Sequence, residues 1–544
     1  MKFTGYSSIH YRLTSPDKPD KYRFALSVIL ITGLSLRLPN LNKSLWNDEI
    51  WSTHVLMGSL RALYNIAIDD WHPPFYQAFM FVWIRVFGDS ELSIRTPSFL
   101  SGILALLLVY VFASRVVERK TALLASFLLA VSPAHIWYSQ EARPYSMLLF
   151  SLLLSLLAYL KLKEPDLRWI WFLVYFGSLF SCALTHYYLA VYVVLISMIC
   201  LLERHRYKKF ILAINFFILV CLAAWIIIVF TMTGAPTGAG YLRAFTFRAL
   251  WQLFFTWFLF GDSWGEQWRH WQLFSAQLFF LVIFVYGLAL ALLHNRAREN
   301  ARNLAPYLFA IPVFLLVASY FGFRGYIERS VLVALPFFYI VIAKGVIGVV
   351  EASESKWLGS LGRTFVRSLA GACIVVVILL SVFTLKEYFR RGEEWTVYKP
   401  NPDWRSAARY LESGINASSE PLTIFAAVPP LELTYYNSRF INIWLGLVPG
   451  QDALTGEDAC AFWPIYSIGP AYLNDFEKFH DALSRTGAQG FYLIHNKYWS
   501  GNFDRVFENL MKDPRVQYQT MQSFKGIEIH KFKTAPGVVS PGLE

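Results

Sequence analysis

Runs of roughly 16 to 22 mostly apolar residues recur along the sequence and constrain its fold more than any other feature. A run of this length lets one helix cross the hydrocarbon core of a bilayer. With 56% hydrophobic and only 16% charged residues, a chain of 544 residues is too apolar for a soluble protein. We therefore predict a polytopic α-helical membrane protein with about eleven spans. The predicted spans lie near residues 24–39, 98–116, 121–138, 145–160, 169–185, 187–203, 210–231, 273–293, 304–321, 331–350 and 368–385.

The charges of the loops test this count, because cytoplasmic loops of membrane proteins are rich in Lys and Arg. The basic segments are the N-terminal tail, 1–23, and the loops at 115–120, 161–168, 204–209, 296–302 and 356–367. We predict that these segments share the cytoplasmic face. The remaining loops then share the outer face, and an odd number of spans places the C-terminus there too.

Two apolar stretches are too short to span a membrane comfortably. The first, "FYQAFMFVWIRVFG" at 75–88, contains Arg85 and would reverse the alternation of the loops if it crossed. We interpret it as an amphipathic helix that lies in the outer interface. The stretch at 250–260 receives the same interpretation.

The composition becomes that of a soluble domain from about residue 386. "DWRSAARYLESG" predicts a helix that stops at its glycine, and "FDRVFENLMKD" predicts a second helix. "PLTIFAAV", "GFYLIHN" and "GIEIHKFK" predict strands. We therefore expect a transmembrane domain at 24–385 and a small α/β domain at 386–544 outside the membrane.

Charge and cysteine content argue against other classes of protein. The formal net charge is +12, but most of the excess lies in short loops, where the positive-inside bias explains it without a nucleic-acid partner. Four of the five cysteines lie in or beside apolar runs, and the sequence contains no CxxC pair. This pattern predicts neither a disulfide framework nor a cysteine-based metal site.

Two adjacent carboxylates, Asp48 and Glu49, follow the first predicted span in "LNKSLWNDEIW". Trp46 and Trp51 flank them, and tryptophan favours the headgroup region of a membrane. We therefore expect the acidic pair at the outer rim of the membrane, with both indoles setting its depth. The dipeptide alone is equally well explained as a pair of ordinary loop acids.

Further ionisable residues are predicted on the same face, in the first outer loop at 40–97, in "SQEARP" and in "FRGYIERS". A single arginine at such a place commonly snorkels to lipid headgroups. Three arginine-containing sites on one face favour a shared function instead. The candidate residues are Asp69, Asp70, His72, Arg95, Glu141, Arg143, Arg324 and Arg329.

Carboxylates beside arginines at a membrane surface suit the transfer of a sugar from a lipid-linked phosphate to an acceptor hydroxyl. A carboxylate takes the acceptor proton as general base, and arginines hold the departing phosphate. Because a phosphate leaves readily once its charge is matched, this set needs no general acid, in contrast to a glycoside hydrolase. Binding of a divalent metal by Glu49, Asp69, Asp70 and His72 is an alternative, although their spacing matches no tight metal motif.

The stretches that begin "HPPFYQAFMFVWIRVFG" and "LLAVSPAHIWYSQEARPYSM" resemble the bacterial members of glycosyltransferase family 39. These are relatives of the dolichyl-phosphate-mannose protein mannosyltransferases and of the aminoarabinose transferase of lipid A, and they have the GT-C membrane fold. The resemblance is strong over residues 46–160 and continues more weakly through "ERSVLVALPFFYIVIAKGV". "DWRSAARYL" looks like the start of the outer domain of these proteins.

The resemblance implies roles for the candidate residues. Asp48 matches the catalytic base, Glu49 belongs to the same acidic dipeptide, and Glu141 matches the second acidic position. His72 stands where the aminoarabinose transferases have a lysine. The expected catalytic residues are Asp48, Glu49 and Glu141, and the expected contacts of the donor phosphate are His72, Arg95, Arg143, Arg324 and Arg329.

The implied function is that of an inverting glycosyltransferase of the bacterial inner membrane. Its donor is expected to be a polyprenyl-phosphate sugar, and its acceptor an envelope glycolipid, polysaccharide or protein, with no certain cofactor. A flippase or transporter of a lipid-linked sugar, with the acids as a proton relay, and a non-catalytic assembly subunit remain alternatives. The sequence does not identify the sugar or the acceptor, because pocket shape and a few polar contacts decide that choice.

Overall fold

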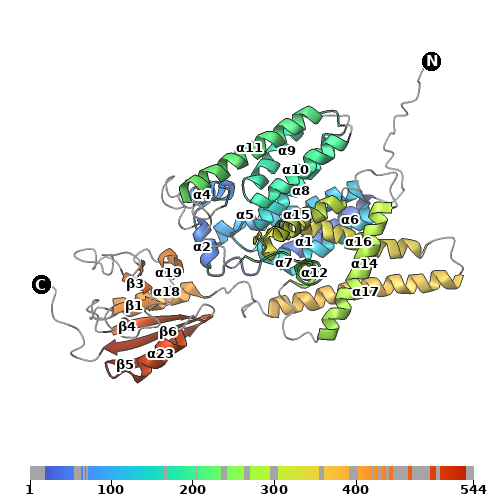
Figure 1. Cartoon of the computed structure of the whole chain (residues 1–544). Helices are drawn as coiled ribbons and strands as arrows, with labels where there is room; N and C mark the ends of the chain where they lie inside the picture. The colour runs from blue at the N-terminus through green and yellow to red at the C-terminus, as the bar shows by residue number, and fades with distance from the viewer. Residues whose placement is uncertain are drawn as a thin grey trace, which may run out of the picture.

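The computed structural model describes residues 19–53, 63–64, 68, 72–164, 168–203, 205–233, 242–261, 270–293, 304–354, 360–390, 402–417, 422–426, 431–436, 440–444, 463–467, 490–497 and 503–534. Most of these residues lie in helices, and a separate sheet is formed near the C-terminus (Figure 1).

Helices occupy every apolar run that the sequence predicted to span the membrane. They are α1 (Pro19–Arg37), α5 (Glu91–Val116), α6 (Arg119–Ala130), α7 (Pro133–Ser139), α8 (Tyr145–Lys161), α9 (Ile170–Ala183), α10 (Ala190–Leu202), α11 (Lys208–Thr233), α14 (His270–Leu293), α15 (Leu304–Tyr320), α16 (Leu335–Ala352) and α17 (Ser360–Arg390).

Fewer of these helices pass a strict test of length and hydropathy. Among the described helices, five are long and apolar enough to cross a membrane singly, or six when the bent pair α6–α7 counts as one span. The chain is therefore a multi-pass helical membrane protein, while the number eleven stays a prediction. Helices α11 and α17 bury only 22% of their most apolar windows. Their exposed apolar side chains are explained by lipid contact.

The run at 121–138 is bent rather than straight. Helices α6 and α7 meet at an angle of 64°. The Ser132 hydroxyl caps α7 by accepting a hydrogen bond from the His135 N–H at 3.4 Å, and Pro133 occupies the first turn. Since proline lacks an N–H and fixes φ, it starts a new helix more readily than it continues the old one.

Both short apolar stretches are also helical. Helix α4 (Phe75–Phe87) buries Tyr76, Gln77, Met80 and Ile84 and exposes Val82, Val86 and Phe87. The second stretch forms α12 (Phe247–Gln252), a π-helical turn η3 (Leu253–Trp257) and α13 (Phe258–Phe260). The exposed side of α4 is therefore largely apolar, and the interpretation as an amphipathic helix in the interface stays a prediction.

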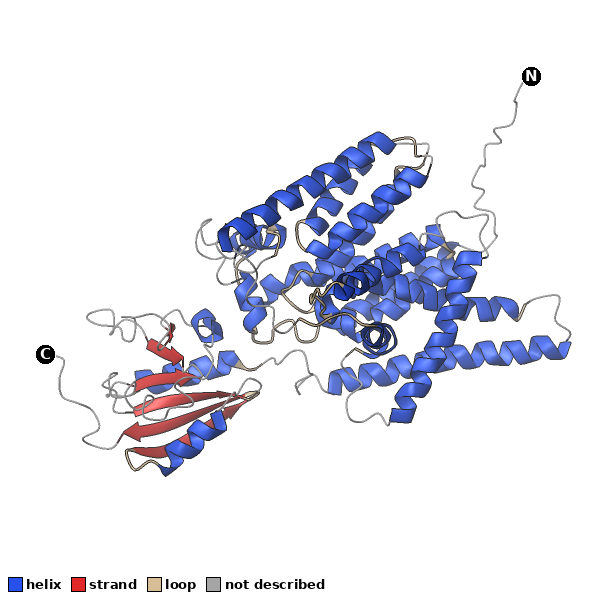
Figure 2. Ribbon diagram, in the orientation of Figure 1, coloured by secondary structure: helices blue, strands red, loops and turns tan. Residues whose placement is uncertain are grey.

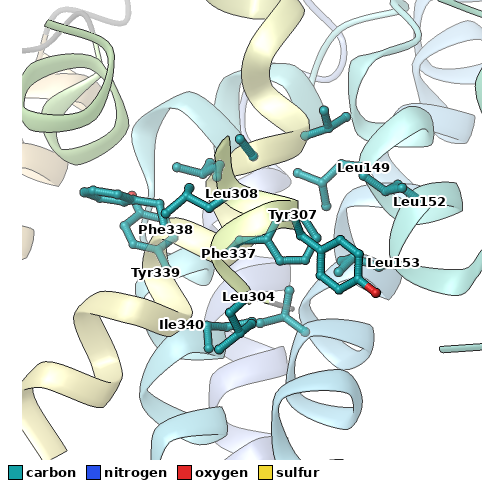
Figure 3. Packing of buried hydrophobic residues seen from close by; sticks show 14 of the residues in the cluster. Leu149, Leu152, Leu153, Leu304, Tyr307, Leu308, Phe337, Phe338, Tyr339 and Ile340 are labelled. Atoms are coloured by element: carbon teal, nitrogen blue, oxygen red, sulfur yellow. The ribbon is translucent and has the colours of Figure 1, made fainter. Parts of the chain in front are cut away.

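One continuous apolar cluster holds the membrane helices together. Figure 3 shows part of it, where side chains of α8, α15 and α16 meet and the rings of Tyr307 and Phe337 lie 5.5 Å apart between centroids. Helices α14 and α16 approach even more closely. A Cβ at Gly287 would overlap the carbonyl oxygen of Val341, and a Cβ at Gly345 would overlap that of Ile283. Small residues allow this backbone-to-backbone packing.

The C-terminal part contains a six-stranded sheet with the order β2-β3-β1-β4-β6-β5 (Figure 2). Strands β1 to β4 pair in parallel, while β6 runs antiparallel to both β4 and β5. The strands are β1 (Leu422–Ala426), β2 (Phe440–Trp444), β3 (Trp463–Ser467), β4 (Gly490–Asn496), β5 (Val516–Phe524) and β6 (Ile527–Thr534).

Helices α18 (Trp404–Asn416), α19 (Leu431–Tyr436) and α23 (Phe503–Lys512) accompany this sheet. Trp404, Leu411 and other residues of α18 pack on Ile424 of β1 and Ile494 of β4. The expected stop of this helix at Gly414 is wrong, since the helix continues to Asn416. Gly414 serves a close approach instead, because a Cβ there would overlap the Tyr492 hydroxyl.

Candidate active site

The acidic dipeptide begins a short helix, α2 (Asn47–Thr53). The Glu49 carboxylate turns back and accepts a hydrogen bond from the Trp46 N–H at 3.4 Å, while the Glu49 and Ile50 amides donate to the Trp46 carbonyl. Acidic residues in a first turn also oppose the positive end of the helix dipole. Trp46 is only 6% exposed, so its indole packs against the protein, and its role in setting the depth of the acidic pair stays a prediction.

Glu49 is fully buried and forms an ion pair with Arg95. The Arg95 guanidinium donates from Nε to Oε1 at 2.8 Å and from Nη2 to Oε2 at 2.6 Å. The Ala142 N–H donates to Oε1 at 2.8 Å. Together with the bond from Trp46, the carboxylate accepts four hydrogen bonds, which is about its full capacity. Glu49 therefore connects α2, α5 and the 140–144 turn.

The remaining donors of Arg95 hold the backbone ahead of α2. Its Nη1 donates to the carbonyls of Leu41 at 3.0 Å and Lys43 at 2.6 Å, and Nη2 donates to that of Ser44 at 3.0 Å. Arg95 is 1% exposed. The sequence placed Arg95 at the donor phosphate, but here its N–H groups are engaged by protein oxygens, so it positions the loop.

Asp48 points away from this buried pair and remains partly accessible, with 25% of its side chain exposed. Its Oδ2 lies 3.5 Å from Arg329 Nη1 and 4.0 Å from Arg143 Nη2. One carboxylate and two guanidinium groups therefore meet at one point. They come from three segments that lie far apart in the sequence: α2, the 140–144 turn, and the 3₁₀ helix η5 (Glu328–Ala334).

Neighbouring groups hold the two arginines. Arg143 Nη1 donates to the Ser52 hydroxyl at 2.5 Å and to the Asp48 carbonyl at 3.2 Å, and the Ser98 hydroxyl donates to the Arg143 carbonyl at 2.9 Å. The Arg329 guanidinium lies 5.9 Å from the ring centroid of Tyr145. Both arginines are mostly buried, with 8% and 18% of their side chains exposed.

Two histidines border this charged group. His72 and His186 stand edge to face, with ring centroids 5.7 Å apart, and the Phe75 N–H donates to the Leu184 carbonyl at 2.9 Å beside them. Burial, together with the charges of His72, Arg329 and Arg143, lowers the pKa of His186 to about 3. His186 therefore stays neutral near pH 7. The sequence placed it on the outer face but did not identify it as a site residue.

Glu141 belongs to the turn that connects α7 to α8 and is 4% exposed. The Arg143 N–H donates to its carbonyl oxygen at 2.8 Å, and its carboxylate charge acts on Tyr76 and Arg95. Gln140 in the same turn donates to the Arg37 carbonyl at 3.1 Å and accepts from the Tyr388 hydroxyl at 3.0 Å. The turn therefore joins the ends of α1 and α17 to the site.

The other three predicted residues are Arg324, Asp69 and Asp70. Arg324 is exposed and has no hydrogen bond or ion pair with another residue in the described part of the chain. Asp69 and Asp70 fall outside the described residues, so the metal interpretation that uses them stays a prediction. Glu49, the other carboxylate of that interpretation, is occupied by its four hydrogen bonds.

The C-terminal part contacts the loop that carries the site. Tyr436 of α19 accepts a hydrogen bond from the Leu45 N–H at 2.8 Å, and Tyr435 donates to the Asp89 carbonyl at 2.6 Å. Arg405 of α18 donates to Glu91 through Nε at 2.9 Å. In Figure 1, α2 and α4 accordingly lie on the side of the helical body that faces the sheet.

A segment that carries part of this site matches a known protein family. Residues 71–233 match the family described as dolichyl-phosphate-mannose-protein mannosyltransferase. The resemblance expected from the sequence is confirmed. The matched segment runs from the residue before His72 to the end of α11 and includes Arg95, Glu141, Arg143 and His186. A comparison of the whole sequence with curated proteins found no match.

Solved structures resemble the chain over nearly its whole length. ArnT from Cupriavidus metallidurans, in the apo state and bound to undecaprenyl phosphate, aligns with a TM-score of 0.52 and 14% identity over 96% of this chain and 99% of ArnT. The chain therefore shares the fold of ArnT. The oligosaccharyltransferase of Archaeoglobus fulgidus in its apo form aligns with a TM-score of 0.49 and 13% identity, over 89% of this chain and 70% of that protein.

Proposed function

We propose that this chain is an inverting glycosyltransferase of the bacterial inner membrane. It moves a sugar from a polyprenyl-phosphate donor to a hydroxyl of an envelope glycolipid, polysaccharide or protein. The reaction takes place at the outer face, with the N-terminal tail, 1–23, in the cytoplasm and the part after residue 386 outside. The proposal rests on one observation: the Asp48 carboxylate lies within 4.0 Å of both Arg143 and Arg329.

This arrangement contains the groups that the reaction requires. A partly exposed carboxylate can accept a proton, and two mostly buried arginines form a site for the singly charged phosphodiester of the donor and for the more highly charged phosphate monoester that leaves. In the absence of donor, Asp48 balances the charge of the arginines. When the donor phosphate binds, it takes over their N–H groups and releases the carboxylate for the acceptor.

The reaction proceeds in one displacement. The acceptor oxygen attacks the anomeric carbon of the donor sugar from the face opposite the phosphate, and its proton passes to Asp48. A bond forms between the anomeric carbon and the acceptor oxygen while the bond to the phosphate oxygen breaks. The electron pair leaves with the polyprenyl phosphate, whose charge Arg143 and Arg329 match. Attack from the opposite face inverts the anomeric configuration.

The other site residues support this step. Glu49 and Arg95 act as positioning residues that hold α2 and the loop before it, rather than as catalytic base and phosphate contact. Glu141 shapes the turn that carries Arg143. His72 and neutral His186 border the arginines and would donate or accept a hydrogen bond at a phosphate oxygen or sugar hydroxyl.

Two further observations support the proposal. ArnT, which has the same fold, was solved with undecaprenyl phosphate bound. The acids and arginines of this site also lie in loops and helix ends, whereas the proton relay of a transporter requires ionisable groups near mid-membrane.

The test begins with a strain of the source bacterium that lacks the gene. Mass spectrometry of its envelope glycolipids, polysaccharides and glycoproteins should reveal an acceptor that has lost one sugar. A plasmid with the wild-type gene should restore the sugar, and the Asp48→Asn variant should not, although it reaches the membrane in equal amount. Restoration by Asp48→Asn would exclude Asp48 as the base.

Proteoliposomes distinguish an enzyme from a flippase. With that acceptor and the polyprenyl-phosphate form of the missing sugar, a glycosyltransferase forms a covalent product on one side of the vesicle. A flippase moves the lipid-linked sugar across the bilayer and forms none. Unchanged envelope glycans in the deletion strain would instead favour a non-catalytic assembly subunit.

A further inference from the structure

Two histidines and one glutamate gather on the C-terminal sheet, away from the site at Asp48. Among the residues that the structure describes, His495, Glu528 and His530 form the one group of three potential metal ligands whose donor atoms all lie within 4.8 Å of one another. His495 belongs to β4, and the other two belong to β6. The site stands on its own, whatever the outcome for the proposed glycosyltransferase activity.

The pairing of the strands produces this group. His495 stands directly opposite Glu528 in the antiparallel pair of β4 and β6. His530 lies two residues beyond Glu528, and side chains two apart on a strand project from the same face. Directly opposite residues have Cβ atoms about 4.5 to 5.5 Å apart, which lets two side chains converge on one small ion.

The distances between the donor atoms fit a tetrahedral ion. His495 Nδ1 lies 3.3 Å from Glu528 Oε2, and His530 Nε2 lies 3.7 Å from the same oxygen. In tetrahedral zinc sites, bonds of about 2.0 to 2.2 Å to nitrogen and oxygen place neighbouring ligand atoms about 3.3 to 3.6 Å apart. Small movements of the side chains would therefore let one ion contact all three atoms.

The surroundings also suit a bound ion. Lys497 Nζ lies 2.7 Å from Glu528 Oε1, whereas Oε2 is the carboxylate oxygen that faces the histidines. The Phe507 ring of α23 lies 4.5 Å from His530 between centroids, and His530 is only 4% exposed. This apolar cover excludes water from one side of the group.

We propose that His495, Glu528 and His530 bind one Zn²⁺ ion, with a water molecule as the fourth ligand. Two imidazole nitrogens and one carboxylate favour zinc over calcium and magnesium, which prefer oxygen ligands. The ion would connect β4 to β6 and stabilise the sheet. A plain network of ion pairs among His495, Glu528 and Lys497 is the competing explanation.

Zinc titration of the full-length protein in detergent, after removal of metal with a chelator, tests the proposal. Isothermal titration calorimetry should give one site in the wild type, and His495→Gln or Glu528→Gln should weaken its affinity at least tenfold. Added Zn²⁺ should raise the melting temperature of the wild type but not of these variants, because only the native fold assembles the site. Ca²⁺ and Mg²⁺ should do neither.

Two control variants make the result decisive. Lys497→Gln should bind zinc as well as the wild type or more tightly, because it removes a competing cation from Glu528. His270→Gln removes an exposed histidine at the start of α14 and should change nothing. The proposal is overturned if His495→Gln and Glu528→Gln bind zinc like the wild type, or if Lys497→Gln weakens binding as much as they do.

Discussion

Glu49 and Arg95 form a two-bonded ion pair in which both side chains are buried, with N···O distances of 2.8 and 2.6 Å. The same guanidinium also binds the carbonyl oxygens of Leu41, Lys43 and Ser44 in the loop that precedes α2. This one contact therefore determines where α2 begins. Since Asp48 is the residue next to Glu49, the pair also determines where the proposed base lies relative to its arginines.

Replacement of Arg95 by lysine should damage both stability and activity. Lysine keeps the positive charge, but it cannot bond both oxygens of Glu49 and three carbonyls together. We expect a loss of at most about 3 to 5 kcal/mol in the free energy of unfolding, the range for removal of one partner of a buried pair, and nearly complete loss of sugar transfer. Thermal melting in detergent and the envelope assay measure the two effects.

Arg85→Lys provides the control for this variant. Arg85 lies on α4 in the same loop region, is exposed and donates to the Phe81 carbonyl within its own helix. Its replacement should leave melting and sugar transfer close to those of the wild type. If Arg95→Lys were as harmless as Arg85→Lys, the proposed positioning role of Arg95 would be wrong.

Arg329 and Arg324 lie five residues apart and should respond differently to the same substitution. Arg329 contacts Asp48, whereas Arg324 is exposed. We expect Arg329→Gln to weaken the binding of undecaprenyl phosphate at least tenfold, since one charge-assisted contact with phosphate is lost. Arg324→Gln should change the affinity less than twofold. Microscale thermophoresis with undecaprenyl phosphate as the probe measures both.

Equal and large effects would restore the expectation drawn from the sequence, in which both arginines contact the phosphate. The opposite order of effects would mean that Arg324, rather than Arg329, binds the donor. Arg143→Gln, which removes the other contact of Asp48, should resemble Arg329→Gln.

Local patterns in the sequence predicted the helices and the residues that share one face. Hydropathy located the helices, because a bilayer requires long apolar segments whatever their partners. The alternation of loop charges placed Asp48, Arg143 and Arg329 on one face, and the structure brings them together. Both inferences use properties of the local sequence.

Such local patterns do not predict which side chains from distant segments will contact one another. Nothing local distinguishes Glu49 from Asp48, but their surroundings differ completely: one is fully buried against Arg95, and the other is partly exposed. His186 was likewise missed as a site residue, because a single histidine in a loop gives no signal until the fold brings His72 beside it. The sequence also did not predict strand β5, because this strand is mostly polar and exposed and lacks a clear apolar pattern.

The neutral His186 should make stability depend on pH. Its pKa is lowered from 6.5 to about 3 by burial and by the charges of His72, Arg329 and Arg143. Between these values the unfolded chain binds a proton that the folded chain does not, so folding is progressively disfavoured as pH falls below 6.5. The contribution of His186 to this slope reaches about 1.4 kcal/mol per pH unit.

His186→Gln should remove this contribution while it keeps a neutral polar side chain. Melting temperatures of the two proteins in detergent should therefore draw closer, or cross in favour of the variant, as pH falls from 7.5 to about 4.5. Parallel curves for the wild type and His186→Gln across this range would show that folding does not lower the pKa of His186.

Close packing of α14 on α16 leads to the last prediction. A methyl group at Gly345 would overlap the carbonyl oxygen of Ile283, which belongs to the backbone of α14 and cannot turn away as a side chain could. Gly345→Ala should therefore force the helices apart and cost about 1 to 3 kcal/mol of stability, as overpacking does in other cores.

Gly177→Ala is the matched control, because no atom lies within 4 Å of the added methyl group at that position of α9. Alanine has a higher helix propensity than glycine, so Gly177→Ala should leave the melting temperature unchanged or raise it. Equal melting temperatures for the two variants would mean that α14 and α16 do not pack backbone to backbone in the membrane.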